Sequence, residues 1–175
     1  MDTDNQQLIL VDEKDNFLGY EKRITCHTGK GIHHRAFVVL LENSAGEVLL
    51  QRRKHQLWDG FWDTTAISHP LHFNDHDESY TEAGNRALML EMGIDPVILD
   101  KIGGFNYFAP HGEYCENEYC AILVGAYEGD VILNPDSVYE YKWMNKNEFI
   151  TLCKNEDKTL TPWAILTGKK LLYEV

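Results

Sequence analysis

Short apolar runs separated by polar turns recur along this chain and predict a sheet. The run at 36–41 (AFVVLL) is continuous, apolar and partly β-branched, which is typical of a buried strand. Turn-forming residues follow at 43–46 (NSAG), and a second strand is expected at 48–51. The same reasoning predicts strands at 8–11, 17–20, 102–108, 114–124, 130–135 and 139–143.

Three segments carry helical signals. Ala83, Ala87 and Leu90 recur at i, i+4 and i+7, and Gly93 follows as a C-terminal stop. A second helix is expected at 145–153, and Thr161-Pro162 supplies the cap and first residue of a third. Strands mixed with three helices predict an α/β layered fold. We expect one domain over 1–175, with 1–7 as a flexible N-terminal tail.

Composition and charge narrow the class of protein. The 175 residues are 43% hydrophobic and 25% charged, which is ordinary for a soluble globular domain. A formal charge of -12 argues against general binding to nucleic acid or to anionic membranes. No apolar run approaches the roughly 20 residues of a membrane span, and the polar, acidic N-terminus is no signal peptide. The four cysteines form no C-x-x-C pair, so we expect reduced thiols and a cytoplasmic location.

Histidines and carboxylates from separate segments are the candidate chemistry. Glu116 and Glu118 alternate along a predicted strand and therefore share one face, where two carboxylates repel unless a cation or proton relieves them. His27 and His34 flank a glycine-bearing loop, and His69 precedes a proline that favours extended backbone. Together they suggest a mixed metal site, in which imidazole suits Zn, Fe or Ni and carboxylate suits Mg or Mn. The alternative is an acidic surface with structural histidines.

Basic and aromatic side chains supply a second set of candidates. Arg52, Arg53 and Lys54 end a predicted strand and could clamp a phosphate, although ordinary surface charge explains them equally well. Trp163 opens the last helix and is first of all a candidate hydrophobic anchor.

Taken as an ordered set, the motifs of this chain resemble type 1 isopentenyl-diphosphate isomerase, a branch of the Nudix superfamily. The resemblance runs from about residue 8 to the last helix. It rests on these residues: His27-Thr28, His34, Ala36-Phe37, Arg52-Arg53, Trp58, Gly60, Trp62, Ile67-Ser68-His69-Pro70, Arg86, Glu91-Met92-Gly93, Tyr107, Glu116-Asn117-Glu118, Cys120 and Thr161-Pro162-Trp163.

The resemblance implies a Nudix α/β/α sandwich with a mixed sheet. It also implies one divalent metal (Mn, Zn or Mg) with five ligands: His27, His34, His69, Glu116 and Glu118. Glu91 matches a carboxylate that shares a second cation, Mg²⁺, with the substrate diphosphate. The implied partner is therefore a small-molecule diphosphate.

The same resemblance implies roles for residues around the metal. Glu118 matches the glutamate that moves a proton at the alkene, and Tyr107 its aromatic neighbour. Trp163 matches an indole that faces the developing carbocation. Arg53 matches a diphosphate-binding arginine. A second basic contact to the diphosphate could be Lys22 or Arg23, and Arg52 is the alternative to Arg53. Lys54 could replace a lysine that follows the arginine pair in the family.

Two departures from the family pattern leave three functions open. Ile67 occupies the position of the catalytic cysteine, and the Nudix hydrolase box keeps Glu91 but lacks its other two glutamates. The sequence therefore predicts an isomerase-like enzyme, a hydrolase of another diphosphate, or a non-catalytic isoprenoid-diphosphate binder. A hydrolase would need a base from Glu91, Glu118 or the acidic loop residues Asp75, Asp77, Glu78 and Glu82.

Overall fold

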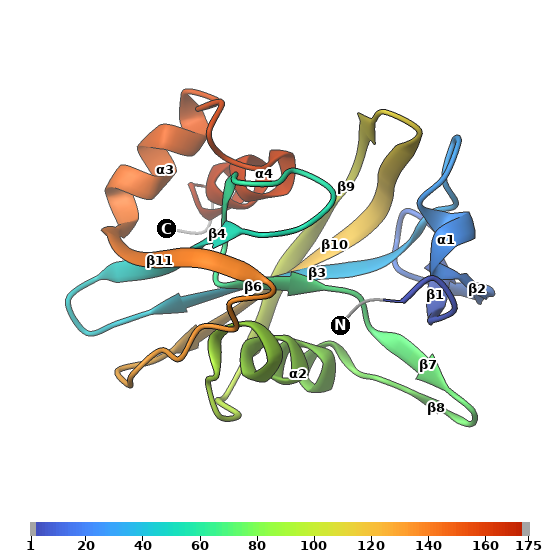
Figure 1. Cartoon of the computed structure of the whole chain (residues 1–175), viewed down its shortest axis with the longest axis horizontal. Helices are drawn as coiled ribbons and strands as arrows, with labels where there is room; N and C mark the ends of the chain where they lie inside the picture. Colours follow the sequence, from blue (N-terminus) through green and yellow to red (C-terminus); the bar gives the residue numbers. More distant parts are fainter. Residues whose placement is uncertain (1–2, 173–175) are drawn as a thin grey trace.

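The computed structural model describes residues 3–172 as a sheet with helices on both faces (Figure 1). Its strands are β1 (Gln7–Val11), β2 (Phe17–Lys22), β3 (His34–Glu42), β4 (Glu47–Arg53), β5 (Trp62–Asp63), β6 (Ala66–Ser68), β7 (Leu71–Phe73), β8 (His76–Asp77), β9 (Asp100–His111), β10 (Tyr114–Ala126) and β11 (Val138–Asn145). Its helices are α1 (Arg23–Cys26), α2 (Tyr80–Met92), α3 (Lys146–Lys154) and α4 (Pro162–Leu171).

The sheet is mixed, as predicted. One path runs β11-β4-β3-β1-β7-β8, and β10 joins it along β3. β3 and β10 run parallel, whereas β9 pairs with β10 in the antiparallel sense. Because β6 and β10 both pair with β3, they lie on its opposite edges. Residues of β6 and β10 can therefore approach one site from two sides.

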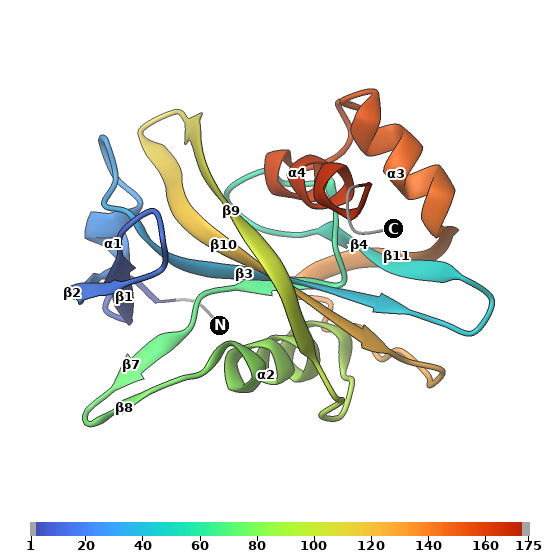
Figure 2. The ribbon, with the colours of Figure 1, turned by 180° about the vertical axis from the view of Figure 1, so that it is seen from behind.

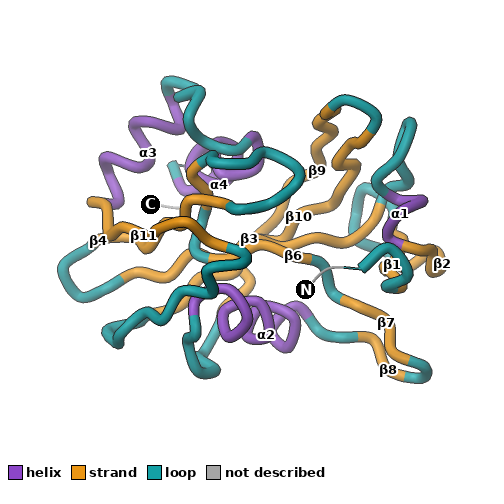
Figure 3. The backbone as a smooth tube through the Cα atoms, in the orientation of Figure 1, coloured by secondary structure: helices purple, strands orange, loops and turns teal. Residues whose placement is uncertain are grey.

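Alternate residues of β3 supply the two halves of the core. Phe37 and Val39 pack with α2, because their side chains share one face of the strand. Ala36 and Val38 point to the other face and pack with Trp163 of α4. Figure 2 shows the same layers from behind, and Figure 3 shows the strands between the helices.

Helix α2 begins and ends where its sequence directs. Ser79 and Glu82 form a reciprocal capping box at its start, and Gly93 adopts the left-handed conformation (φ 62°) at its end. Ala83 and Ala87 are buried, as expected from the periodicity. The third residue of that pattern, Leu90, is 44% exposed, because it lies at the rim of a cavity rather than in the core.

Two local expectations need correction. Residues 130–135 form no strand, because the backbone amides of Ile132 and Asn134 donate to the carbonyls of Met92 and Glu91 at the end of α2 rather than to a strand. The glycine-bearing segment between His27 and His34 is a loop, as expected, and the short helix α1 precedes it. The tail expected at 1–7 is shorter, because Gln7 already pairs with Lys22 in the sheet and Gln6 accepts a backbone hydrogen bond from Arg23. Residues 1–2 lie outside the described part.

Candidate active site

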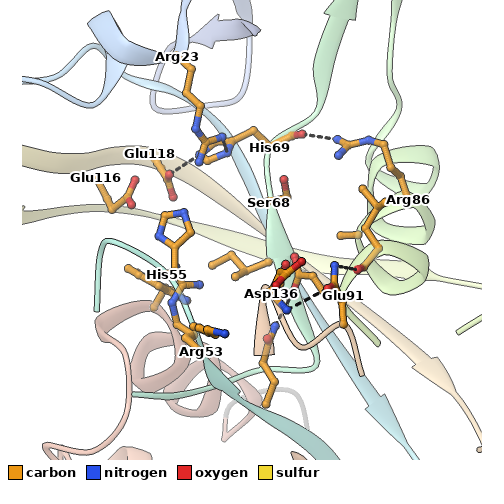
Figure 4. Close-up of a pocket in the computed structure, with 18 of the residues that line it drawn as sticks. Arg23, Arg53, His55, Ser68, His69, Arg86, Glu91, Glu116, Glu118 and Asp136 are labelled. Carbon is orange, nitrogen blue, oxygen red and sulfur yellow. Dashed lines mark hydrogen bonds and ion pairs between the residues drawn. The ribbon is translucent and has the colours of Figure 1, made fainter. Parts of the chain in front are cut away.

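Three strand ends and one helix end bring the predicted metal ligands together. Glu118 of β10 lies directly opposite His34, the first residue of β3. His27 caps α1, and His69 follows the last residue of β6. Each of these side chains, and that of Glu116, is buried. The residues that were separate in the sequence therefore form one cluster, part of which is labelled in Figure 4.

The ligand atoms of this cluster converge on one point. One candidate ligand atom from each of the five residues can be chosen such that all lie within 4.8 Å of one another. His27 Nε2 is 3.0 Å from Glu116 Oε2, and His69 Nε2 is 2.9 Å from Glu118 Oε1. Such packing of three imidazoles around two carboxylates is the arrangement that a mixed nitrogen and oxygen metal site requires.

Backbone carbonyls orient two of the imidazole rings. His27 Nδ1 faces the carbonyl of Arg23 at 2.9 Å, and His34 Nδ1 faces that of Ile32 at 2.7 Å. A carbonyl only accepts, so Nδ1 donates and Nε2 is left with its lone pair directed into the cluster. Second partners of this kind are usual for metal-binding histidines.

Unpaired buried atoms show that the cluster fits a cation. Within residues 3–172, His27 Nε2, His34 Nε2 and Glu116 Oε2 are buried without a hydrogen-bond partner. Such atoms are costly unless something else satisfies them. A divalent metal would satisfy all three, and its charge would offset the two adjacent carboxylates. The chain therefore has a candidate divalent-metal site here.

Burial and neighbouring groups shift the pKa values of Glu118 and His69. Although burial acts to raise it, the imidazole of His34 lowers the pKa of Glu118 to about 2. Burial lowers the pKa of His69, and the Arg23 guanidinium acts in the same direction. Arg23 Nη1 lies 2.8 Å from His69 Nδ1, and guanidinium can only donate. Glu118 is therefore an anion, and His69 is neutral, in the structure as it stands.

A cavity of about 260 Å³ opens beside the cluster. Tyr107, Trp163 and Ile67 line its apolar part, and Glu116 and Glu118 lie at its wall. The hydroxyl of Tyr107 donates to Glu118 Oε2. The structure thus brings together the three residues expected to act at an alkene, Glu118, Tyr107 and Trp163, and it places Ile67 beside them.

The basic residues divide into those that reach this cavity and those that do not. Arg53, Lys54, Arg23 and Arg86 line it. Lys22 is exposed and is not among the described residues that line the cavity, because α1 turns the chain so that Arg23 reaches it instead. Arg52 also points away, since its guanidinium binds Glu140 and the carbonyl of Gly60.

Glu91 lies in the same cavity but apart from the five ligands (Figure 4). Its Oε2 accepts a 2.6 Å hydrogen bond from Gln51 Nε2, which holds the carboxylate at the wall. Lys54 is on the same rim and donates to the carbonyl of Pro135. The cavity that holds Glu91 is therefore also lined by Lys54 and Arg53, which could meet an anion.

Two of the acidic residues considered as hydrolytic bases, Glu78 and Glu82, make structural contacts instead. Glu78 accepts two hydrogen bonds from Arg86, at 2.7 and 2.8 Å, and Arg86 also donates to the carbonyl of His69. Glu82 belongs to the capping box of α2. Asp75, Asp77, Glu78 and Glu82 are all absent from the described residues that line the cavity.

Sequence reasoning missed two residues at this site. His55 lines the cavity, and its Nδ1 accepts a hydrogen bond from the amide of Leu57. Asp63 lies behind the cavity wall and binds both Trp163 and Arg53. The available signal for Asp63 was an aspartate directly after an aromatic pair, at 61–63 (FWD).

Comparison with known proteins identifies the family. The NUDIX domain profile matches residues 32–164, so the chain belongs to the Nudix family. Solved structures agree on the fold. A Deinococcus radiodurans protein covers 94% of this chain and is itself 98% covered, with a TM-score of 0.71 at 15% identity. A MutT protein of Methanosarcina mazei covers 81% and is 94% covered, with a TM-score of 0.61 at 23% identity. The predicted Nudix fold is confirmed.

Sequence relatives place the chain more narrowly. It is 32% identical to "Isopentenyl-diphosphate Delta-isomerase 2" of Aromatoleum aromaticum, over 90% of this chain and 82% of that one. It is 33% identical to the protein of the same name from Photorhabdus laumondii, over 89% and 86% respectively. Within the Nudix family, it therefore belongs with the isopentenyl-diphosphate isomerases, which are enzymes. Among residues 3–172, no helix combines the length and apolar character that crossing a membrane requires.

Proposed function

We propose that this protein binds an isoprenoid diphosphate and shifts the position of its double bond, as the names of its relatives describe for isopentenyl diphosphate. The observation that carries the proposal is the contact of Glu118 with two partners at once. Glu118 belongs to the buried ligand cluster and also accepts from Tyr107 at the apolar wall of the cavity. A carboxylate in that position is suited to proton transfer at a hydrocarbon lodged against Trp163.

The chemistry requires a cationic intermediate. Addition of a proton to the alkene gives a tertiary cation, and loss of a proton from a neighbouring carbon completes the shift. With a pKa of about 2, Glu118 is unprotonated and suits the step in which a proton is accepted. Trp163 presents an aromatic ring to the cation, an interaction worth roughly 0.5–2 kcal/mol.

The five cluster residues would hold the divalent metal, for which we propose Mn, Zn or Mg. When bound, the metal would supply positive charge that relieves the Glu116 and Glu118 carboxylates and fixes their orientation. His27 and His34 keep their rings aligned for this through the carbonyls of Arg23 and Ile32.

The diphosphate end is assigned to the basic residues that line the cavity. The chain carries a charge of -12, so an anionic substrate needs positive charge focused in one place. We assign that role to Arg53, Lys54 and Arg23, which all line the cavity. Glu91 is the carboxylate we expect to share Mg²⁺ with the diphosphate, because Mg²⁺ is commonly held by one or two carboxylates together with phosphate oxygens.

Ile67 favours a second candidate, a binder without turnover. This side chain lies in the apolar cluster of the cavity and has no proton to transfer. Cys120 is not a substitute, because it is fully buried and is not among the described lining residues. For hydrolysis, the acidic loop residues lie away from the cavity, which leaves Glu91 and Glu118 as the candidate bases. A cytoplasmic location stays a prediction.

Incubation with isopentenyl diphosphate in heavy water distinguishes these functions. The protein is first loaded with Mn, Zn or Mg. Deuterium in the allylic product supports the isomerase, and phosphate or pyrophosphate release supports the hydrolase. Mg²⁺-dependent binding by calorimetry without either product indicates the binder. That outcome would refute the double-bond shift, and an absence of binding as well would refute the binder too.

A further inference from the structure

Asp63 is a buried carboxylate with no role in the mechanism above. It ends the two-residue strand β5, and its residue surface is fully inaccessible to solvent. It does not line the cavity, but it contacts two residues that do. A buried carboxylate is costly unless its partners are specific, so those contacts need an explanation.

Both Asp63 oxygens accept from the indole of Trp163, at 2.8 Å to Oδ1 and 2.7 Å to Oδ2. Asp63 Oδ2 also accepts from Arg53 Nη1 at 3.1 Å. The amide of Thr64 donates to Oδ1 at 2.7 Å. Indole, guanidinium and amide nitrogens can only donate. Burial raises the pKa of Asp63, whereas the Arg53 guanidinium and the Trp163 indole act to lower it. The Thr64 hydroxyl also donates to Oδ1, at 3.3 Å, so every hydrogen bond to this carboxylate comes from a donor and favours the ionised form.

Trp163 and Arg53 also contact each other. The guanidinium carbon of Arg53 lies 5.1 Å from the centre of the Trp163 ring. A positive charge there opposes any second cation that approaches the same ring, since like charges repel. The negative charge of Asp63, in contact with Arg53, offsets that opposition.

We propose that Asp63 is a positioning residue that fixes the Trp163 indole and offsets part of the Arg53 charge at the face of that ring, so that the ring can accept a cationic substrate carbon while Arg53 keeps its role at the diphosphate. The inference rests on the proposed function for its ligand. Its two parts are separable: the hydrogen bond sets the orientation of the ring, and the charge sets the electrostatic potential at its face. A neutral amide in place of Asp63 keeps the size of the side chain and removes the charge.

The test compares two diphosphate esters of equal size in the presence of Mg²⁺. One carries a branched saturated alkyl chain. In the other, a protonated tertiary amine nitrogen replaces the branching carbon and mimics the cation. The ratio of their Kd values cancels the shared diphosphate. In Asp63→Asn we expect the preference for the amine to fall by roughly tenfold, the scale of a desolvated cation–π contact. Asp59→Asn, the same change at an exposed aspartate nearby, is the matched control and should leave the ratio unchanged.

A double variant separates charge from structure. Asp63→Asn combined with Arg53→Gln removes both charges, so the preference for the amine should recover to within about threefold of the wild-type value. A purely structural loss at Asp63 would not be restored by a second substitution. If Asp63→Asn alone fails to fold, the double variant decides. An unchanged ratio in a folded Asp63→Asn protein, or no recovery in the double variant, overturns the proposal.

The indole N–H resonance of Trp163 provides an independent reading. It is assigned by its absence in Trp163→Phe, and we expect it to shift in Asp63→Asn but not in Asp59→Asn. If the wild-type protein binds neither ester, the proposed function fails, whereas this resonance still tests the hydrogen bond. A resonance that does not move in Asp63→Asn overturns the positioning role.

Discussion

Replacement of Ile67 by cysteine should increase isomerisation of isopentenyl diphosphate. Ile67 lies on β6 and Glu118 on β10, at opposite edges of β3, and both line the cavity. A thiol at 67 therefore enters the site from the side away from Glu118, where a group able to transfer a proton is missing. General acid and base groups are typically worth about 10²–10⁴-fold, so Ile67→Cys should gain at least the lower of these factors.

The structural cost of this substitution is moderate. Ile67 is partly exposed and packs at the edge of an apolar cluster that includes Trp163 and Tyr107. Its backbone pairs with Val38, and that pairing does not depend on the side chain. Loss of carbon groups from such a position costs roughly 1–2 kcal/mol, at the scale of a conservative core truncation. The variant should therefore remain folded.

Ile67→Ala is the matched control, because it opens the cavity without supplying a proton. The assay measures deuterium incorporation and allylic product from isopentenyl diphosphate in heavy water, for wild type and both variants at equal metal content. We expect Ile67→Cys to exceed Ile67→Ala by about 10²-fold or more. Equal rates would show that space rather than the thiol limits the reaction. Robust turnover by the wild type would show that another group supplies the proton.

The remaining predictions concern the metal, the diphosphate and pH. The protein purified without chelator should contain one tightly held divalent ion, and His69→Ala should lose both the ion and thermal stability. Metal analysis and melting curves check this. A metal content in His69→Ala equal to that of the wild type would contradict it. Arg53→Ala should weaken Mg²⁺-dependent diphosphate binding by on the order of tenfold or more in calorimetry, whereas Arg52→Ala, whose guanidinium points away, should not. Because the pKa of Glu118 is lowered to about 2, its contribution to the stability of the metal-free protein is complete above its ordinary pKa and is lost as the pH falls toward 2. Denaturant titrations should show that slope, and Glu118→Gln should flatten it.

The secondary structure was largely readable from the sequence, because its signals are local. Ser79, Gly93 and Thr161 cap or end helices through contacts with residues a few positions away. The alternation of Glu116 and Glu118 fixed their shared face, since a strand has a period of two. Residues 130–135 misled the prediction because a short apolar run does not reveal whether a partner strand is available.

Residue types and strand alternation suggested a mixed metal site at the five ligands, with an acidic surface as the alternative. Only the resemblance decided for the ligand set and named the Nudix fold, because spacing along the chain does not determine distance in space. The convergence of His27, His69 and Glu118 depends on the parallel pairing of β3 with β10 and on the approach of β6 to the other edge of β3. Both pairings link segments dozens of residues apart, and no local pattern encodes them.

The tertiary structure alone decided which charges face the cavity. Neighbours in sequence separated: Arg53 lines the cavity while Arg52 binds Glu140 outside it. The contact of Asp63 with Trp163 exists only because α4 packs there, since the two residues are 100 positions apart in the sequence. The sequence determined which elements form and which chemical groups are present, because those depend on local geometry and residue type. Packing determined which groups meet, because a buried polar or charged group forms its hydrogen bonds with the residues that the fold places beside it.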